Sequence, residues 1–416
     1  MERLGLARLL GTPDIAAEPS EGPAVIEERD PAAFMRSFAR AVGEDKQVFL
    51  ADPAWGPRER SALSELTGAG RPASGPGWLL IPSGGTGGEP KFARHDEETI
   101  SAAVRGFRGH FDVERVNSVG VLPLYHVSGF MAWMRAALTG GQYLPWDWKR
   151  LESGEFPVGP AGHPRRGAQR ERWYLSLVPT QLQRLLSPTG PGAADAAKWL
   201  RTFDAVFLGG GPMWPELAAA AAGASIPVSL SYGMTETAAM VAAQHPEEFL
   251  SGDRSCGSPM PHARIGLTAA GLVRISGESV FRGYFPAWSD SREFTTGDLG
   301  SIDERGRLSI LGRSDTVIIT GGKKVEPSEI EAALRTTGEF SDIAVVGLPD
   351  AEWGQMVTAC YPEGGRSPDL TRVVAALGSL AAFKRPRRFI PISDWPRNAQ
   401  GKLNRAELVR RAINRT

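Results

Sequence analysis

The nine residues at positions 83–91, SGGTGGEPK, form a segment whose composition is well suited to binding an anion. They include four glycines, two hydroxyl residues and one lysine: Gly84, Gly85, Gly87, Gly88, Ser83, Thr86 and Lys91. Backbone N–H groups of consecutive glycines can converge on an anion, and the hydroxyls and the lysine add donors and a positive charge. The segment predicts a polyphosphate-binding loop, and the alternative is a surface loop without a ligand. It is not a Walker A element, because Pro90 precedes Lys91 and Phe92 follows it.

The composition limits the classes of protein to which the chain can belong. Its 47 basic and 47 acidic residues cancel, so no overall charge attracts nucleic acid or an anionic membrane. The two cysteines, Cys256 and Cys360, lie far apart without a histidine at ligand spacing, which excludes a disulfide scaffold and a zinc site. The longest uncharged stretches are broken by glycine and proline and do not resemble membrane spans. The sequence therefore predicts a cytoplasmic protein with neither a nucleic-acid nor a membrane partner.

Short apolar runs in the middle of the chain indicate a parallel sheet. SVGVLPL, WYLSLVPT, DAVFLGG and IPVSLSY are separated by helix-like segments. Continuous apolar strands that alternate with helices are typical of a parallel sheet covered on both faces. Ligands of such sheets bind at the carboxyl ends of the strands. Residues 123–129, 209–212 and 232–237 lie at or directly after these ends, and they are therefore candidate ligand-binding segments.

The pattern changes twice in the rest of the chain. Residues 255–311 form short alternating segments around the turns AAG and ERG, which predicts antiparallel sheet. A helix with Pro327 in its first turn is followed by three apolar strand-like runs and a helix at about 369–380, which predicts a small α+β domain. The predicted fold class is α/β. It comprises a large N-terminal domain of parallel sheets flanked by helices, with an antiparallel β subdomain, and a small mobile α+β C-terminal domain.

Six further motifs follow the glycine-rich loop. They are LPLYHVSG (122–129), LGGGPM (208–213), YGMTET (232–237), TGD (296–298), GRSDTVIITGGKKVEPSEIE (312–331) and NAQGKLNR (398–405). In this order they resemble the motifs of the adenylate-forming superfamily, which contains acyl-CoA synthetases, luciferases and the adenylation domains of peptide synthetases. The resemblance spans about four fifths of the chain. It implies that the protein activates a carboxylic acid with ATP and Mg²⁺ and transfers it to coenzyme A.

The resemblance also implies which residues bind ATP. The glycine-rich loop would hold the β- and γ-phosphates, Thr235 would contact the α-phosphate, and Tyr232 would stack on adenine. Asp298 would accept hydrogen bonds from both ribose hydroxyls, with the help of Arg313, although an aspartate after a glycine is equally compatible with a turn. The remaining positions implied in nucleotide binding are Gly210, Gly211, Pro212, Gly233 and Met234.

Two more residues are implied in the chemical step itself. A carboxylate that attacks the α-phosphate of ATP brings two anions together, so cations and donors are needed where they meet. By similarity, Lys402 would bridge the carboxylate and the α-phosphate, and Glu236 would hold the Mg²⁺ ion. The alternatives are a solvated lysine in a basic tail and a helix cap formed by TET.

A rotation of the small domain between two half-reactions is also implied. Residues 1–314 would form the large adenylation domain and residues 315–416 the lid domain, with the hinge at Asp315. After adenylation, a strand pair near residue 321 would face the site and admit coenzyme A. The candidate coenzyme A contacts are Gly321, Gly322 and Lys323, and a solvated basic turn is the alternative for the lysine.

The acid substrate is indicated by the residues around the HVSG motif. LPLYHVSG lacks the Phe-Asp pair with which amino-acid-activating domains hold a substrate ammonium group. HVSG followed by Arg135, and SLVPTQLQRLL at 176–186, resemble the 2-succinylbenzoate–CoA ligase branch of menaquinone and phylloquinone synthesis. That substrate has two carboxylates, so one would react while Arg135 would bind the other in a bidentate manner. His126 would lie beside the acid and near the centre where the thioester forms.

Several alternatives stay open at this point. Arg135 is equally compatible with a structural ion pair, and His126 with a packed or capping histidine. The substrate could be another aryl acid or a fatty acid, or the chain could bind ATP without catalysis, although Lys402 and Glu236 weigh against the last case. A homodimer is compatible with the sequence, since homodimers are common among soluble enzymes. The loop departs from the family's usual pattern at Gly84, Gly87 and Glu89.

Overall fold

The structure is a computed structural model. It describes residues 22–68, 77–83, 90–157, 171–187, 192–364, 367–378, 380–397 and 403–415. Six of the candidate site residues lie outside these ranges: Gly84, Gly85, Thr86, Gly87, Gly88 and Lys402. Their predicted roles therefore depend on the sequence and on the described residues that flank them.

A four-stranded sheet in the order β1-β2-β3-β4 comes first in the chain. Its elements are β1 (Ala24–Ile26), α2 (Pro31–Gly43), β2 (Val48–Leu50), α3 (Pro57–Thr67), β3 (Leu79–Ser83) and β4 (Lys91–His95). Strands β3 and β4 are antiparallel, and Ser83 is paired with Lys91, so both ends of the glycine-rich segment lie at one end of this sheet. The sequence does not predict this sheet, because its first two strands have three residues each and show no alternation of apolar and polar residues.

The predicted parallel sheet is confirmed, and it is larger than expected. Its seven strands have the order β11-β10-β9-β8-β7-β5-β6. Strands β5 to β9 are parallel to one another, β10 runs antiparallel to β9, and β11 runs antiparallel to β10. The strands are β5 (Val116–Gly120), β6 (Tyr143–Pro145), β7 (Arg172–Leu177), β8 (Ala205–Leu208), β9 (Val228–Met234), β10 (Ala239–Ala243) and β11 (Ser258–Pro259). Strand β5 ends at Gly120, whereas the predicted run SVGVLPL continues to Leu124.

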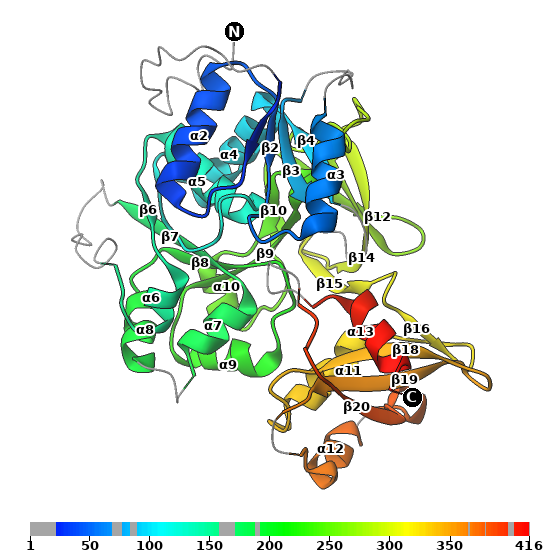
Figure 1. Ribbon diagram of the computed structural model, residues 1–416. Helices are drawn as coiled ribbons and strands as arrows, with labels where there is room; N and C mark the ends of the chain where they lie inside the picture. Colours follow the sequence, from blue (N-terminus) through cyan, green and yellow to red (C-terminus); the bar gives the residue numbers. More distant parts are fainter. Residues whose placement is uncertain are drawn as a thin grey trace.

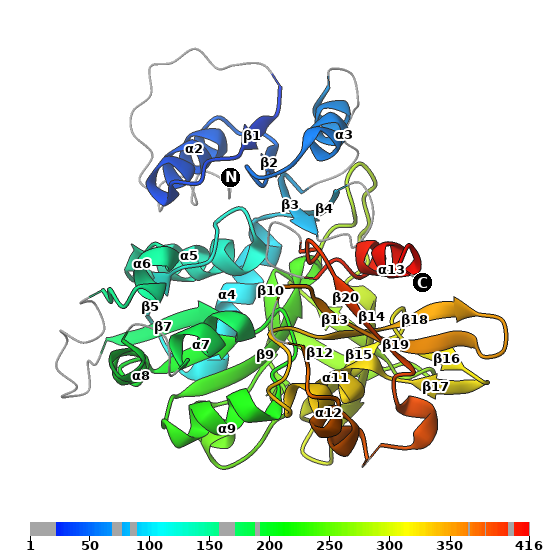
Figure 2. The same cartoon turned by 60° about the horizontal axis from the view of Figure 1, so that its bottom comes forward.

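Helices cover both faces of the parallel sheet. Helices α4 (Glu97–Phe111) and α5 (Val127–Thr139) lie between it and the first sheet (Figures 1 and 2). The opposite side carries α6 (Trp148–Glu152), α7 (Pro179–Leu185), α8 (Ala193–Leu200) and α9 (Pro215–Gly223), and α10 (Pro246–Leu250) follows β10. Trp173, Leu175 and Leu177 of β7 pack into one core cluster with residues of α7, α8 and α9. The helices thus remove apolar strand surface from water, which is the main stabilising contribution in such a fold.

The antiparallel segment and the small α+β unit are also present as predicted. Strands β12 (Ala263–Leu267), β13 (Leu272–Gly277), β14 (Glu293–Ile302) and β15 (Leu308–Arg313) form an antiparallel sheet in chain order. The last sheet contains β16 (Ile318–Thr320), β17 (Lys323–Val325), β18 (Ala344–Asp350), β19 (Gly354–Pro362) and β20 (Arg388–Ile392). Its helices are α11 (Pro327–Arg335), α12 (Leu370–Leu377) and α13 (Arg405–Ile413).

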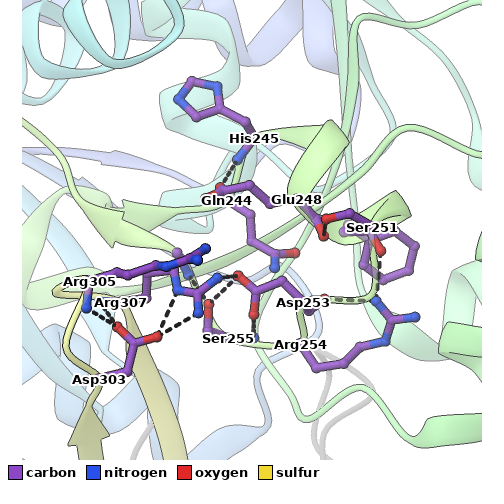
Figure 3. A network of polar contacts seen from close by, with 12 residues as sticks. Gln244, His245, Glu248, Ser251, Asp253, Arg254, Ser255, Asp303, Arg305 and Arg307 are labelled. Atoms are coloured by element: carbon purple, nitrogen blue, oxygen red, sulfur yellow. Dashed lines mark hydrogen bonds and ion pairs between the residues drawn. The ribbon is translucent and has the colours of Figure 1, made fainter.

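A polar network joins the end of the parallel sheet to the antiparallel sheet (Figure 3). Asp253, which follows α10, accepts hydrogen bonds from the backbone N–H and the hydroxyl of Ser255, both at 2.9 Å, and from Arg307 at 2.8 Å. Arg307 also pairs with Asp303 at the turn between β14 and β15. Burial would raise the pKa of Asp253, but the Ser255 donors and Arg307 outweigh it and lower that pKa. The network fixes β14 and β15 against the parallel sheet.

A buried histidine ring occupies the space beside a glycine of α4. A Cβ atom added to Gly106 would lie 1.6 Å from Nδ1 of His262, which is 8% exposed. We expect Gly106→Ala to lower the free energy of unfolding by about 2 kcal/mol, because over-packing a core outweighs the gain of roughly 1 kcal/mol in helix propensity. Urea denaturation measures the effect. Gly109→Ala in the same helix is the control, since its Cβ would meet only Pro261 at 3.4 Å, and equal stability of the two variants would contradict the clash.

Two buried histidines make stability depend on pH. Burial lowers the pKa of His95 and of His262 to about 4 in each case. Between the ordinary histidine pKa of about 6.5 and pH 4, the unfolded chain therefore binds more protons than the folded one, and stability must fall as the pH falls. The stability that these rings contribute is complete above pH 6.5. We expect His262→Gln to reduce the slope of unfolding free energy against pH in this window by about 1.4 kcal/mol per pH unit, measured by urea denaturation. An unchanged slope would contradict this expectation.

Candidate active site

The predicted nucleotide residues meet at the carboxyl ends of β8 and β9. Gly210, Gly211 and Pro212 are exposed in the connection from β8 to α9, and Gly210 has a φ of +75° that suits glycine. Tyr232, Gly233 and Met234 end β9, and Thr235 and Glu236 follow in the short helix η1 (Thr235–Thr237). The location confirms the prediction that the motifs follow the strand ends.

Tyr232 and Asp298 form a hydrogen-bonded pair across two sheets. The Tyr232 hydroxyl donates to Oδ2 of Asp298 at 2.6 Å, and Nη1 of Arg313 lies 3.3 Å from Oδ1 of the same carboxylate. Burial and the nearby Asp298 charge raise the pKa of Tyr232, so its hydroxyl remains a donor at neutral pH. The family resemblance implies that the Tyr232 ring stacks on adenine, and it does not imply this contact with Asp298. The pair holds the Asp298 carboxylate in a fixed orientation beside the end of β9.

The turn after β9 is tightly constrained. A Cβ atom on Gly233 would lie 1.9 Å from the carbonyl oxygen of Ala239, so only glycine fits there. Ala238 and Ala239 both have positive φ values, of 51° and 76°, which is unfavourable for residues with a side chain. Nonglycine residues remain in this region only when the surrounding structure determines it, and such strain is common at functional sites. The turn thus presents Thr235 and Glu236 in one conformation.

Three site residues have no signal in the sequence, and two of them, His95 and Tyr284, lie beside this turn. Nε2 of the fully buried His95 lies 2.8 Å from the carbonyl oxygen of Thr235, and since a carbonyl only accepts, Nε2 carries the proton. Glu236, which is 6% exposed, accepts hydrogen bonds from Ser83 at 2.5 Å and from the missed residue Tyr284 at 2.6 Å. The third missed residue, Asp52, lies near His126. No periodic pattern in the sequence marks these three residues, because each contacts a residue that is far away along the chain.

Lys91 lies close to the same group of side chains. Its Nζ atom is 5.6 Å from the centre of the Tyr284 ring, and its backbone pairs with that of Ser83. The structure therefore brings together the two ends of the glycine-rich segment and Glu236. Such a group of a hydroxyl, a lysine and a carboxylate can bind a polyphosphate with its metal ion.

Arg135 is buried and has no acidic partner within the described part of the chain. It lies on α5, is 5% exposed, and stacks its guanidinium 4.7 Å above the ring of Phe107 on α4. Burial lowers its pKa to about 10, so it stays a cation at neutral pH. An ion pair was the open alternative to a substrate contact, but no described Asp or Glu forms one with this guanidinium. A buried charge normally has a partner, so this cation is suited to a bound anion.

His126 directly precedes α5, at the N-cap position, and its side chain lies near Asp52. Its Nε2 atom is 3.7 Å from Oδ2 of Asp52, whose side chain is 2% exposed. The imidazole makes no capping hydrogen bond with the helix, so the capping alternative is not supported. Desolvation raises the pKa of Asp52. The proximity of the two side chains can orient the imidazole at the carboxyl end of β5.

The predicted hinge residue is linked to the nucleotide residues. Asp315 accepts two hydrogen bonds from Arg313, at 2.9 Å and 2.8 Å, and Arg313 also reaches Asp298. The hydrogen bond from Arg313 lowers the pKa of Asp315. Arg313 thus contacts both Asp298, which lies beside β9, and Asp315, the predicted hinge residue.

The candidate coenzyme A residues are not brought to the nucleotide residues. Gly321 and Gly322 form the turn between β16 and β17, with positive φ values of 53° and 75°, and Lys323 lies 4.5 Å from the Phe383 ring. This hairpin lies on the side of the last sheet away from the parallel sheet (Figures 1 and 2). Arg335 of α11 instead lies 5.6 Å from the ring of Trp214, next to α9. In this arrangement α11, and not the hairpin, faces the larger part of the molecule.

Two general site types are not found in the described ranges. Those residues contain no group of three or more His, Cys, Asp or Glu side chains that could hold a metal ion. A magnesium ion bound through one carboxylate and substrate phosphates does not require such a group. The described helices include none that is both long and apolar enough to cross a bilayer.

Comparison with known proteins identifies two matching family models. The model "AMP-binding enzyme" matches residues 78–285, and the model "AMP-binding enzyme C-terminal domain" matches residues 329–402. The chain is 32% identical over 354 residues to the 2-succinylbenzoate–CoA ligase of Geobacillus kaustophilus, covering 80% of this chain and 68% of the relative. It is also 32% identical over 355 residues to a probable 2-succinylbenzoate–CoA ligase of Mycobacterium tuberculosis, covering 80% of this chain and 84% of the relative.

Solved structures share the fold. The o-succinylbenzoate CoA synthetase (MenE) of Bacillus subtilis, solved with the acyl-adenylate intermediate OSB-AMP, aligns with a TM-score of 0.79 and 22% identity. The alignment covers 98% of this chain and 92% of that one. ATP-bound MatB from Rhodopseudomonas palustris aligns with a TM-score of 0.74 and 23% identity, over 99% and 92% of the two chains. At these identities the likeness establishes the fold of the chain.

Proposed function

The chain belongs to the family of AMP-binding enzymes, and we propose that it is the ligase that converts 2-succinylbenzoate to 2-succinylbenzoyl-CoA. The reaction consumes ATP, passes through an acyl-adenylate and is a step of menaquinone or phylloquinone biosynthesis. The curated relatives with this activity in their names support the substrate. The site residues support the chemistry.

The observation that carries the substrate assignment is the burial of Arg135 without an acidic partner in the described ranges. A monocarboxylic acid would use its carboxylate in the reaction and leave this cation unpaired. 2-Succinylbenzoate has a second carboxylate that can pair with it. A planar guanidinium binds a carboxylate through two parallel hydrogen bonds, which gives orientation as well as affinity.

ATP would bind along the ends of β8 and β9. We assign the adenine to the slot formed by Gly210, Gly211 and Pro212 with the Tyr232 ring, and the ribose hydroxyls to Asp298. Thr235 would contact the α-phosphate, and Lys91 with the glycine-rich loop would hold the β- and γ-phosphates. Glu236 would hold Mg²⁺, which neutralises negative charge on the phosphate oxygens when bound.

Adenylation joins two anions, and this determines what the side chains must do. A carboxylate oxygen attacks the α-phosphorus, the bond from that phosphorus to the bridging oxygen breaks, and pyrophosphate leaves. Lys402 would lie between the carboxylate and the α-phosphate and stabilise the charge that both carry in the transition state. Arg135 would fix the far carboxylate, so that the reacting carboxylate approaches in line with the leaving group.

The second half-reaction needs a different arrangement of the small domain. The thiolate of coenzyme A attacks the acyl carbonyl carbon, the anhydride bond from that carbon to the bridging oxygen breaks, and AMP leaves with the oxygen and the electron pair. Residues 315–416 would rotate about Asp315 relative to residues 1–314 and bring Gly321, Gly322 and Lys323 to the site. His126 would lie beside the reacting carbonyl. The present position of the β16–β17 hairpin fits the state that precedes this rotation.

The setting of the reaction follows from the charge and composition. We propose that the enzyme acts in the cytoplasm on small-molecule substrates, without a nucleic-acid or membrane partner, as its balanced charge suggests. A homodimer is compatible with this function.

Acid-dependent pyrophosphate release tests the proposal. With ATP and Mg²⁺ present, we expect 2-succinylbenzoate to support release far better than benzoate or a medium-chain fatty acid, and added coenzyme A to give the thioester. Preference for another acid would replace the substrate assignment and keep the ligase chemistry. ATP binding without release on any acid would contradict the ligase function itself.

A further inference from the structure

Glu236 is oriented by two side chains that come from distant parts of the sequence. Ser83, at the end of β3, donates to Oε1 of Glu236 at 2.5 Å, and the Tyr284 hydroxyl donates to the same oxygen at 2.6 Å. No described residue donates to Oε2. Two donors on one oxygen stop the carboxylate from rotating, and they leave the second oxygen available to a hard cation.

Tyr284 is itself held firmly in place. Arg282 and Phe285 donate backbone hydrogen bonds to Arg94 and Phe92 of β4, and Gly283 accepts one from Arg94. The segment from Phe281 to Phe285 therefore runs beside β4 like an extra strand. The Tyr284 ring also packs edge-on against Phe281, with the ring centres 4.9 Å apart. A side chain fixed by backbone pairing and by packing can position its hydroxyl within a few tenths of an ångström.

The Tyr284 hydroxyl is the donor in its contact with Glu236, because a carboxylate oxygen only accepts hydrogen bonds. Lys91, at 5.6 Å from the ring centre, connects the tyrosine to the residues that would hold phosphate. The tyrosine thus contacts the candidate metal-binding carboxylate and lies near the candidate phosphate-binding lysine.

We propose that Tyr284 is a positioning residue that, together with Ser83, holds Glu236 in the orientation that binds the divalent ion of MgATP. The proposal rests on the proposed function, since it takes Glu236 as the metal ligand. Tyr284 acts through Glu236 and does not touch the reacting atoms. Its removal weakens the contribution of the metal ion to ATP binding and leaves the binding of metal-free ATP unchanged.

Tyr284→Phe tests this role because it keeps the ring and removes only the hydroxyl. Residues that orient a metal ligand typically change metal affinity by about 10–100-fold when mutated. We therefore expect the Mg²⁺ concentration for half-maximal pyrophosphate release to rise by about 10-fold. Calorimetric titration with ATP should show a similar weakening in Mg²⁺ and no change in EDTA. Tyr361→Phe, a half-buried tyrosine packed on Phe340 in the last sheet, is the matched control and should change neither quantity.

Two further variants make the test decisive. In a Glu236→Gln background, Tyr284→Phe should add no further change in the Mg²⁺ response, because the two residues act as one unit. Ser83→Ala removes the other donor and should raise the Mg²⁺ requirement as well, so a folding failure of one variant does not end the test. A lower turnover of Tyr284→Phe with an unchanged Mg²⁺ response would overturn the proposal, as would an additional effect in the Glu236→Gln protein.

The calorimetric measurement separates this proposal from the ligase function. If the wild-type protein released no pyrophosphate with any acid, the ligase function would fail. A weaker binding of MgATP by Tyr284→Phe, with metal-free ATP binding unchanged, would still support the positioning role. Equal binding of MgATP by the variant and the wild-type protein would overturn it whatever the reaction.

Discussion

Arg135→Leu is expected to lower kcat/KM for 2-succinylbenzoate by about 100-fold or more. Truncating one partner of a buried, hydrogen-bonded charge pair costs about 2–5 kcal/mol, much of it from the charge that is left unpaired. In the variant, the far carboxylate of the substrate would be buried opposite a leucine. Pyrophosphate release at varied acid concentration measures the loss. The rate with benzoate, which has no second carboxylate, should change little.

The stability of the Arg135→Leu variant distinguishes a substrate contact of Arg135 from an ion pair within the protein. Replacing a buried charge by an apolar side chain is often neutral or stabilising, whereas breaking an internal pair is destabilising. Because no described acid pairs with Arg135, we expect Arg135→Leu to unfold at the same or a higher denaturant concentration than the wild-type protein. Arg135→Lys should lose less activity than the leucine variant, since it keeps the charge and loses only the bidentate geometry.

A second arginine provides the control for this prediction. Arg254 also stacks on a phenylalanine, with its guanidinium 4.4 Å from the ring of Phe249, but it is exposed and lies in the network of Figure 3. Arg254→Leu should leave kcat/KM unchanged. Loss of stability in Arg135→Leu together with unchanged use of 2-succinylbenzoate would remove the main support for the dicarboxylate assignment.

The parallel sheet could be predicted because its signal is local. The sequence runs that contain β5, β7, β8 and β9 are short, apolar and separated by helices. Such runs are sufficient to predict strands that are buried on both faces of a parallel sheet. The ligand-binding segments could then be placed by geometry alone, since parallel strands present their carboxyl ends at one edge. The first sheet was missed because its strands β1 and β2 are too short to show a period.

The contacts within the site could not be predicted from local patterns. Glu236 is 153 residues from Ser83 and 48 residues from Tyr284, and hydrogen bonds between such distant segments leave no periodic signal. The burial of Arg135 was also hidden, because an arginine on a helix usually faces solvent. The family motifs supplied the candidate nucleotide residues, whereas His95 and Tyr284, which contact Thr235 and Glu236, could be found only in the packed structure.

The small domain carries the residue with the largest expected role in the first half-reaction. Arg397 and Leu403, which flank the segment with Lys402 in the sequence, form a β-bridge with each other, and Leu403 packs on the core of the small α+β unit. A rotation of that domain would therefore move Lys402 with it. We therefore predict that Lys402 contributes to adenylation and not to thioester formation.

Lys402→Ala is expected to slow adenylation by about 10²–10³-fold, the loss typical for removal of one group that stabilises transition-state charge. Thioester formation from separately supplied acyl-adenylate and coenzyme A should be unchanged, because the lysine is needed only where the two anions meet. Single-turnover assays of the two half-reactions measure both rates. Lys198→Ala, an exposed lysine on α8, is the control and should alter neither. Equal losses in both half-reactions would contradict a role confined to adenylation, and they would also argue against the rotation of the small domain about Asp315.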